Sequence, residues 1–212
     1  MTPPSGGRRT RAVIFDVGNV LYDWNLRQFF QKLVPAHELE LFLREVVTLD
    51  WHNQHDAGRP FAETSAELIA QWPRFAEAIA AFGPRFSDTV TGLLPGMGAI
   101  VAALHGRGVP LYAITNFSQE FWPPFRAQEA AIFDLFDDIL VSGAVKLVKP
   151  DPAIYALALD RFGIAPGESL FVDDRADNIA AGEAMGIAGH LFQGAAPLRA
   201  DLEARGLLPP AG

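Results

Sequence analysis

Three acidic side chains of this chain stand directly after short apolar runs. Asp16 follows the run AVIF, and the pair Asp173 and Asp174 ends the run LFVDD. Carboxylates that converge without a cation repel one another and raise each other's pKa. Mg²⁺ is a hard cation that proteins hold with one or two carboxylates, water and phosphate oxygens. The pattern therefore predicts a magnesium site if these runs end at the same place.

A hydroxyl, an amide and an ammonium group accompany these acids. Thr115 and Asn116 follow the apolar run YAI, and Lys149 comes after a further apolar run, DILV. Such donors suit an anion bound beside a cation, and phosphoryl transfer depends mainly on positioning and charge neutralisation. Each residue alone could equally be a strand-end cap or a turn former. Several chemically matched strand ends in one chain favour a site over that structural role.

The acids and donors can meet only if the apolar runs are strands of one parallel sheet, because ligands bind beyond the carboxyl ends of such strands. Short apolar runs predict strands, and apolar residues three and four apart predict helices. The predicted strands are 11–16, 110–115, 138–141, 169–173 and 188–192, and the predicted helices are 97–107, 118–129, 151–163, 176–186 and 196–205. This alternation predicts an α/β fold with a doubly wound parallel sheet, a Rossmann-like core. Pro123 and Pro124 should delay or break the second of these helices.

Residues 22–93 have a different pattern. Their apolar spacing indicates about four helices, and no convincing strand is predicted between Asn25 and Thr91. The first strand therefore pairs with the later strands, and the predicted domains are a core of residues 11–21 and 94–206 and an inserted helical cap domain of residues 22–93. The most polar stretch of the cap is WHNQHDAGR. Its two histidines, His52 and His55, could share a metal, but we interpret them as polar groups at the cap surface.

The composition excludes several classes of protein. With 17 basic and 25 acidic residues the formal net charge is −8, which argues against nucleic-acid binding. The absence of cysteine excludes disulfides, zinc–thiolate sites and cysteine nucleophiles. No apolar run reaches the ~20 residues of a membrane helix, and residues 1–11 lack the apolar segment of a secretory signal. We expect a soluble cytoplasmic protein, a monomer or a homodimer, that binds neither nucleic acid nor membrane.

Four segments together resemble the motifs of the haloacid dehalogenase-like hydrolase superfamily. They are FDVGNVL with Asp16, AITNFS with Thr115, KPDP with Lys149, and FVDDRADN with Asp173 and Asp174. The segments occur in the family's order, and the helical insertion resembles the branch with a cap after the first motif. The FDxGNV spelling and the DDRADN run look most like small sugar-phosphate phosphatases and the phosphatase domain of epoxide hydrolases.

The resemblance implies a magnesium-dependent phosphatase for a small phosphorylated metabolite, with a sugar phosphate as one candidate. Asp16 would be the nucleophile and would form an aspartyl-phosphate that water then hydrolyses. Besides Asp16, the backbone carbonyl of Gly18 and the side chain of Asp174 would hold Mg²⁺. Asp173 would be the next ligand, binding either directly or through water.

The same resemblance assigns the groups that would surround the substrate. Thr115 and the backbone N–H of Asn116 would hold phosphoryl oxygens, and Lys149 would neutralise charge on the nucleophile and the phosphate. Asn178, four residues after Asp174, could face back from its helix and orient a metal ligand or its water. A plain surface position is the alternative for Asn178.

Gly18 departs from the family pattern. Most family phosphatases carry an aspartate there as general acid and base, a role that contributes roughly 10²–10⁴-fold to the rate. Three outcomes are open: a better leaving group, such as a phosphate on an anomeric carbon; a substitute acid; or weak phosphatase activity. The first is favoured. Asp23 is the nearest candidate for a substitute acid, and it could equally be a helix N-cap.

Two other functions compete with a phosphatase. A metal-free 2-haloacid dehalogenase of the same fold would use the aspartate to displace halide from carbon. Family dehalogenases lack the paired acids of the fourth motif, so Asp173 and Asp174 argue against this function. A non-catalytic binding or regulatory relative is the second alternative, and the joint presence of Asp16, Thr115 and Lys149 argues against it.

Overall fold

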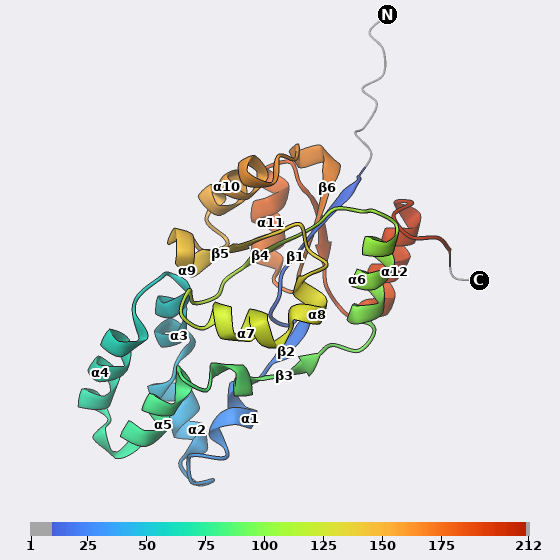
Figure 1. Ribbon diagram of the computed structural model, residues 1–212. Helices are drawn as coiled ribbons and strands as arrows, with labels where there is room; N and C mark the ends of the chain where they lie inside the picture. The colour runs from blue at the N-terminus through green and yellow to red at the C-terminus, as the bar shows by residue number, and fades with distance from the viewer. Residues whose placement is uncertain (1–9, 211–212) are drawn as a thin grey trace, which may run out of the picture.

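A five-stranded parallel sheet forms the centre of the molecule (Figure 1). The structure is a computed structural model that describes residues 10–210. The strands lie in the order β5-β4-β1-β6-β7, and each neighbouring pair is parallel. Their bounds are β1 (Ala12–Phe15), β4 (Leu111–Thr115), β5 (Asp138–Val141), β6 (Ser169–Asp173) and β7 (Ala188–Leu191). This order confirms that the first strand belongs to the sheet formed by the later strands.

Helices cover both faces of the sheet, because successive side chains of each buried strand point to opposite faces. In β1, Val13 and Phe15 pack in one buried cluster and Ile14 packs in another. The first cluster includes α6 (Met97–Gly106) and α12 (Ala195–Ala204), and the second includes α10 (Pro152–Phe162) and α11 (Ala176–Ala184). The doubly wound α/β architecture is therefore confirmed.

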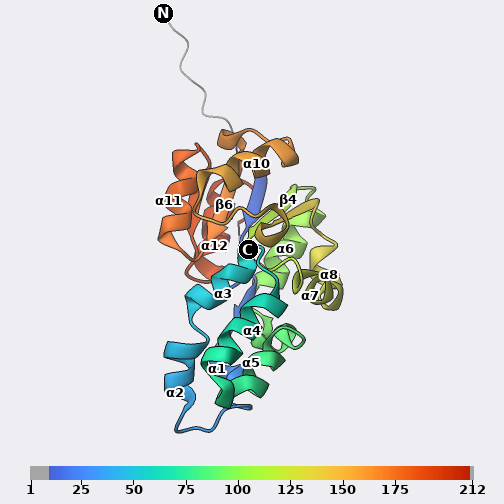
Figure 2. The ribbon, with the colours of Figure 1, turned by 90° about the vertical axis from the view of Figure 1, so that its left-hand side faces the viewer.

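Residues 22–93 lie between β1 and α6 and are mainly helical. Figure 2 shows α1, α2, α4 and α5 at one end of the molecule, with α3 between them and the sheet. The helices are α1 (Leu26–Phe30), α2 (Leu39–Leu41), the π-helix η1 (Phe42–Val46), α3 (Leu49–Asp56), α4 (Phe61–Gln71) and α5 (Ala76–Phe82), with 3₁₀ turns η2 (Pro73–Phe75) and η3 (Phe86–Thr89). We call residues 22–93 the cap segment, and its division from the core as a domain stays a prediction.

Two short strands join the cap segment to the core. β2 (Tyr22–Trp24) and β3 (Val90–Leu93) pair antiparallel. The prediction of no strand between Asn25 and Thr91 is thus wrong for its last two residues. Strands of three and four residues with half-exposed side chains carry no clear alternating pattern, and their pairing links residues far apart in the chain. The pair holds the two ends of the cap segment side by side.

The remaining core elements follow β4 and β5. They are α7 (Trp122–Gln128), α8 (Ala130–Phe133), α9 (Ser142–Val145) and the 3₁₀ turn η4 (Pro166–Glu168). Helix α7 begins at Trp122 with prolines in its first turn, which confirms that Pro123 and Pro124 delay the helix predicted at 118–129.

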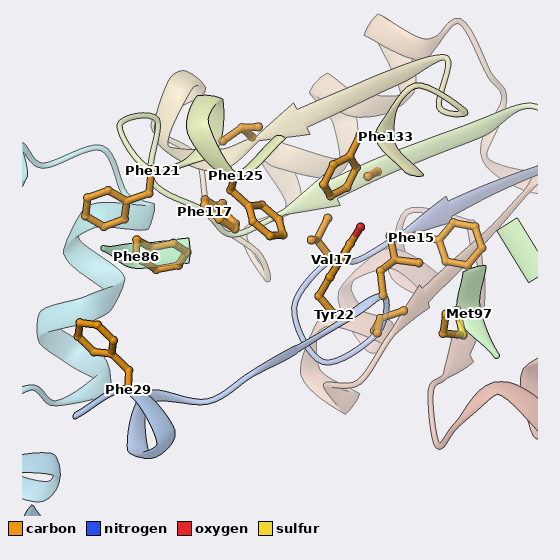
Figure 3. Packing of buried hydrophobic residues seen from close by; sticks show 14 of the residues in the cluster. Phe15, Val17, Tyr22, Phe29, Phe86, Met97, Phe117, Phe121, Phe125 and Phe133 are labelled. Atoms are coloured by element: carbon orange, nitrogen blue, oxygen red, sulfur yellow. The ribbon is translucent and has the colours of Figure 1, made fainter. Parts of the chain in front are cut away.

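Aromatic rings join the cap segment to the core (Figure 3). Phe86 of the cap segment stacks on Phe121 with a centroid distance of 4.9 Å, and it meets Phe117 edge-on at 4.9 Å. These rings belong to the buried cluster that also contains Val13 and Phe15 of β1. One apolar interior therefore runs from the sheet into the cap segment.

Among residues 10–210, no helix is both long enough and apolar enough to cross a membrane. Of residues 1–11, whose lack of an apolar segment entered the expectation of a cytoplasmic protein, only Thr10 and Arg11 belong to the described residues.

Candidate active site

The structure brings the three predicted carboxylates together at the carboxyl edge of the sheet. Asp16 directly follows β1, Asp173 ends β6, and Asp174 comes next. One oxygen atom from each of them lies within 4.8 Å of the others. Lys149 reaches the same place, with its Nζ 2.8 Å from Asp16 Oδ1 and 2.7 Å from Asp173 Oδ2. Residues from distant parts of the sequence thus form one charged cluster.

Asp16 is buried, but one of its oxygens is free. Its Oδ1 accepts hydrogen bonds from the Val17 N–H at 2.7 Å and from Lys149. Within residues 10–210, its Oδ2 has no hydrogen-bond partner. Burial raises the pKa of Asp16 to about 7, although Lys149 opposes this shift. A carboxylate held by one oxygen, with the other left without a hydrogen bond, suits a nucleophile.

With all three acids ionised, the charges of this cluster do not balance without a cation. Burial lowers the pKa of Lys149, but the charges of Asp16 and Asp173 outweigh this effect and raise it above its usual value. Lys149 is therefore positively charged. Three ionised carboxylates around one ammonium leave a surplus of two negative charges. A divalent cation would remove that surplus, so the donor set fits Mg²⁺.

The two acids of the fourth motif have different surroundings. Asp174 is half-buried and lines the cavity described below; burial, followed by the charge of Asp173, raises its pKa. Asp173 is fully buried and its Oδ1 accepts from the Arg175 N–H at 2.8 Å. Asn178 is also buried, and its Nδ2 donates to both oxygens of Asp173 at 3.0 and 3.1 Å. Asn178 thus faces the acids from α11, and a surface position is wrong.

Asn116 makes a contact that the sequence did not reveal. Its Oδ1 accepts from the Lys149 N–H at 2.8 Å, and its Nδ2 donates to the Lys149 carbonyl oxygen at 3.0 Å. This reciprocal pair fixes the backbone of Lys149 beside the end of β4. The predicted role of the Asn116 N–H toward a phosphoryl group stays a prediction.

Thr115 and Gly18 lie at the same edge. Thr115 ends β4 opposite Val141 of β5 and is 1% exposed. Gly18 lines the cavity, as its predicted role as a carbonyl ligand requires. The roles of Thr115 and Gly18 toward substrate and metal stay predictions.

A cavity of about 320 Å³ opens in front of the carboxylates. Both the core and the cap segment contribute to its wall. Its apolar lining comprises Val17, Tyr22, Trp24, Leu49, Phe86, Val90, Phe117 and Phe125. Its polar lining comprises Asp16, Asn19, His52, Asn53, Asp56, Asn116, Lys149, Asp174, Arg175 and Asn178, together with Gly18.

Part of the polar stretch of the cap segment is buried, and His52, Asn53 and Asp56 line this cavity. The interpretation of His52 and His55 as surface groups is wrong, because their exposed fractions are 7% and 0%. His55 Nε2 contacts Thr64 Oγ1 at 2.7 Å, whereas His52 lies in the cavity wall beside Asp56. Trp51, His52 and His55 recur three and four apart on α3, a helical spacing that could have indicated a buried face.

Asp23 does not serve as the substitute acid at this site. It lies in β2, its Oδ2 accepts a hydrogen bond from Thr91, and it is absent from the cavity lining. It is not a helix cap either, because the side chain that caps α1 is Asn25. The acid that reaches the cavity from the cap segment is Asp56, which sequence reasoning missed as a site residue.

Comparisons with known proteins agree with this geometry. A sesquiterpene phosphatase of Aspergillus oryzae is 29% identical over 84% of this chain and 88% of its own length. A phosphoglycolate phosphatase of Yersinia pseudotuberculosis is 33% identical over 62% of this chain, and the chain spans 54% of that relative. The crystal structure of a haloacid dehalogenase family enzyme from Bacteroides thetaiotaomicron superposes with a TM-score of 0.71, at 17% identity, over 88% of this chain and 95% of that one.

The family model for haloacid dehalogenase-like hydrolases matches residues 10–186, which include all four motif segments. The match confirms the resemblance drawn from those segments. This chain belongs to the haloacid dehalogenase-like hydrolase family.

Proposed function

We propose that this protein is a magnesium-dependent phosphatase that hydrolyses a small phosphorylated metabolite through an aspartyl-phosphate on Asp16. The observation that carries the proposal is the carboxylate cluster, in which Lys149 Nζ contacts Asp16 at 2.8 Å and oxygens of Asp16, Asp173 and Asp174 lie within 4.8 Å of one another. A phosphate monoester and a divalent cation complement that charge pattern.

In the proposed reaction, the free oxygen of Asp16 attacks phosphorus and the alcohol leaves. Water then hydrolyses the aspartyl-phosphate and regenerates the carboxylate. Lys149 stabilises negative charge on the phosphoryl group, and Thr115 and the Asn116 N–H orient its oxygens. Bound Mg²⁺ would be held by Asp16, Asp174 and the Gly18 carbonyl, with Asp173 as the next ligand, and it would supply charge neutralisation.

The residues of the cavity wall indicate which alcohol part of a substrate could bind. Rings from the cap segment and the core make much of the wall apolar, including Trp24, Phe86 and Phe117. Such a wall favours an apolar alcohol, and one relative is named as a sesquiterpene phosphatase. A sugar phosphate, which the motif spelling favours, would use Asn19 and Asn53 for its hydroxyl groups. Both classes belong in the substrate screen.

Hydrolysis of 4-nitrophenyl phosphate, with Mg²⁺ and with a chelator, tests the proposal. We expect turnover with Mg²⁺, loss of turnover with the chelator, and no turnover in Asp16→Asn under either condition. Asp23→Asn is the matched control, since Asp23 lies outside the cavity lining, and it should keep the wild-type rate. Turnover that persists in Asp16→Asn would contradict the proposal.

The same preparation separates the competing functions. A 2-haloacid dehalogenase would release halide from 2-chloropropionate without metal. A binding-only relative would turn over neither compound. The paired acids Asp173 and Asp174 favour the metal-dependent reaction, so we expect no halide release. Alkyl, prenyl and sugar 1-phosphates are then compared by kcat/KM to assign the substrate class.

We also propose a cytoplasmic location and a monomeric or homodimeric state, with no nucleic-acid or membrane partner. Light scattering on the purified protein measures the assembly, and imaging of a tagged full chain measures the location.

A further inference from the structure

Gly18 lines the cavity without a side chain that could carry a proton. Within residues 10–210, the acidic side chains in the cavity lining are Asp16, Asp56 and Asp174. Asp16 is the proposed nucleophile and Asp174 is a proposed metal ligand, so neither is available to protonate a leaving group. Asp56, at the end of cap helix α3, is left without a role in the proposed function.

The core fixes the backbone of Asp56. Its carbonyl oxygen accepts a hydrogen bond from Ser142 Oγ at 2.7 Å, and Ser142 directly follows β5. Ser142 Oγ also accepts from the Phe117 N–H at 2.9 Å. The fit beside this bond is tight, because a Cβ added at Gly143 would lie 3.2 Å from the His55 carbonyl oxygen. Asp56 is thus held at the sheet edge that carries the carboxylates.

The side chain of Asp56 is buried and incompletely paired. It is 4% exposed, and among the described residues its Oδ1 has no hydrogen-bond partner. Its Oδ2 lies 3.5 Å from His52 Nε2. Burial, together with the charge of Asp16, raises the pKa of Asp56 to about 8, against a lowering by Lys149. Burial therefore favours the protonated form of Asp56.

The neighbouring side chains of His52 and Lys149 do not compete with Asp56 as proton donors. Burial lowers the pKa of His52 to about 3, so its ring is neutral and has no extra proton to donate. Lys149 holds its protons between two carboxylates. Asp56 lines the cavity that holds the nucleophile, and the protonated form of such a carboxyl group has the chemistry of a general acid.

We propose that Asp56 is the general acid and base of this enzyme and that the cap segment supplies the function missing at Gly18. This inference rests on the proposed phosphatase function, because it assigns the proton for the ester that Asp16 attacks. The proton donor belongs to the cap segment and the nucleophile to the core, so the catalytic set is complete only when α3 is docked.

The proton balance covers two steps. In the first, a bond forms between Asp16 and phosphorus, the ester P–O bond breaks, and the Asp56 proton moves to the departing alcohol oxygen. In the second, the Asp56 carboxylate takes a proton from the attacking water, the new P–O bond forms, and the bond to Asp16 breaks. Asp56 ends protonated, and the products are the alcohol and inorganic phosphate.

The dependence of rate on the leaving group tests this assignment. Wild-type protein and Asp56→Asn are assayed with Mg²⁺ on 4-nitrophenyl phosphate, whose leaving group needs no proton, and on phenyl phosphate, whose leaving group does. We expect Asp56→Asn to lower kcat/KM for phenyl phosphate by about 100-fold or more and that for 4-nitrophenyl phosphate by less than about tenfold. Asp56→Glu should restore part of the phenyl phosphate activity.

Asp50→Asn is the matched control, because it makes the same change at an exposed position of α3, and it should leave both rates unchanged. Equal losses on the two esters in Asp56→Asn would assign Asp56 a structural role and overturn the inference. If the variant does not fold, the wild-type protein decides the question, since a steep fall in its rate toward poorer leaving groups would overturn the inference as well.

The two proposals fail in different ways. Wild-type protein that hydrolyses neither ester contradicts the phosphatase function itself. A different result would contradict only the role of Asp56. In that result the wild-type protein hydrolyses both esters and Asp16→Asn hydrolyses neither, but Asp56→Asn shows no selective loss on phenyl phosphate.

Discussion

Lys149 determines the charge balance of the carboxylate cluster, since its Nζ contacts Asp16 and Asp173 while being almost completely buried. Removing one partner from a buried ion pair leaves an uncompensated charge in a medium of low dielectric constant. The charges of this cluster therefore make the folded state depend on this ammonium group.

Replacing Lys149 by Met should lower the free energy of unfolding by about 3–5 kcal/mol in the presence of a chelator. Added Mg²⁺ should recover part of the loss, because a cation held by the same carboxylates replaces the missing positive charge. Urea unfolding with and without Mg²⁺ measures both effects.

Lys146→Met is the control for this prediction, because Lys146 is an exposed lysine in the same loop. Its free energy of unfolding should stay within about 0.5 kcal/mol of the wild type. A Lys149→Met variant as stable as Lys146→Met would show that the carboxylates are protonated in the folded protein.

Asp56 should make stability depend on pH. Its pKa is raised from 3.8 to about 8, so between these values the folded protein holds a proton that the unfolded chain releases. Its contribution to stability therefore falls as pH rises through that window. Asp56→Asn removes the effect, and the stability of the variant relative to wild type should increase from pH 5 to pH 8, by at most about 1.4 kcal/mol per pH unit.

The difference between two proteins is measured because other groups cancel in it. His52 acts in the opposite sense, since its lowered pKa makes stability rise with pH below about 6.5, its usual pKa. Asp16 and Lys149 face Asp56 and are present in both proteins. Urea unfolding at each pH provides the data, and a difference that stays flat from pH 5 to pH 8 would refute a protonated Asp56.

At the scale of elements, the contact between α3 and α9 closes the cap segment onto the core. A Cβ added at Gly143 would lie 2.6 Å from the Gln119 nitrogen and 2.9 Å from the Phe117 carbonyl oxygen. These are backbone atoms, so they cannot move as the end of a flexible side chain can. Gly143→Ala should therefore displace α9 and with it the contact between Ser142 and Asp56 of α3, and kcat/KM should fall.

Gly143→Ala should also lower the free energy of unfolding, because overpacking typically costs about 1–3 kcal/mol. Gly106→Ala is the control, because nothing lies within 4 Å of the added methyl group at the exposed end of α6. Thermal unfolding and phosphate release are measured on both variants. Gly106→Ala should be at least as stable as the wild type, and a Gly143→Ala variant with wild-type values would contradict the tight docking.

The elements that sequence predicts well are those whose pattern is local. β1, β4 and β6 are apolar runs buried on both faces of the sheet, and α10 has a regular apolar face that ends at Gly163. The pairing of β2 with β3 was missed because it depends on contacts across the whole cap segment. Local periodicity contains no information on such distant partners.

The site residues also divide into those that a local pattern predicts and those that depend on distant contacts. Asp16 and Asp174 could be predicted because strand ends of a parallel sheet converge by topology. Asp56 could not, because its position depends on how the cap segment docks, through Ser142 and the rings around Phe86. A polar stretch such as WHNQHDAGR has the composition of a surface, and only tertiary packing reveals that it faces a cavity.

At the scale of the whole molecule, the cap segment and the core share one buried cluster. Phe86 stacks on Phe121 and meets Phe117, and the cluster continues to Phe15 of the sheet (Figure 3). Units that share so much buried apolar surface should unfold together. Calorimetry should show one transition with an enthalpy of roughly 150 kcal/mol, the typical value for a chain of this length, and equal to the van't Hoff enthalpy.

Phe86→Ala should weaken this coupling, because it removes the ring that bridges the two parts. Truncation of a buried phenylalanine costs about 3–5 kcal/mol, and here much of the loss falls on contacts between the cap segment and the core. The ratio of van't Hoff to calorimetric enthalpy should therefore drop below one, as the cap segment begins to unfold before the sheet. Leu191→Ala, at a partly exposed position of β7, should leave the ratio unchanged. Two separate transitions in the wild-type protein would contradict this shared interior, and would mean that α3 and its Asp56 leave the site without unfolding the core.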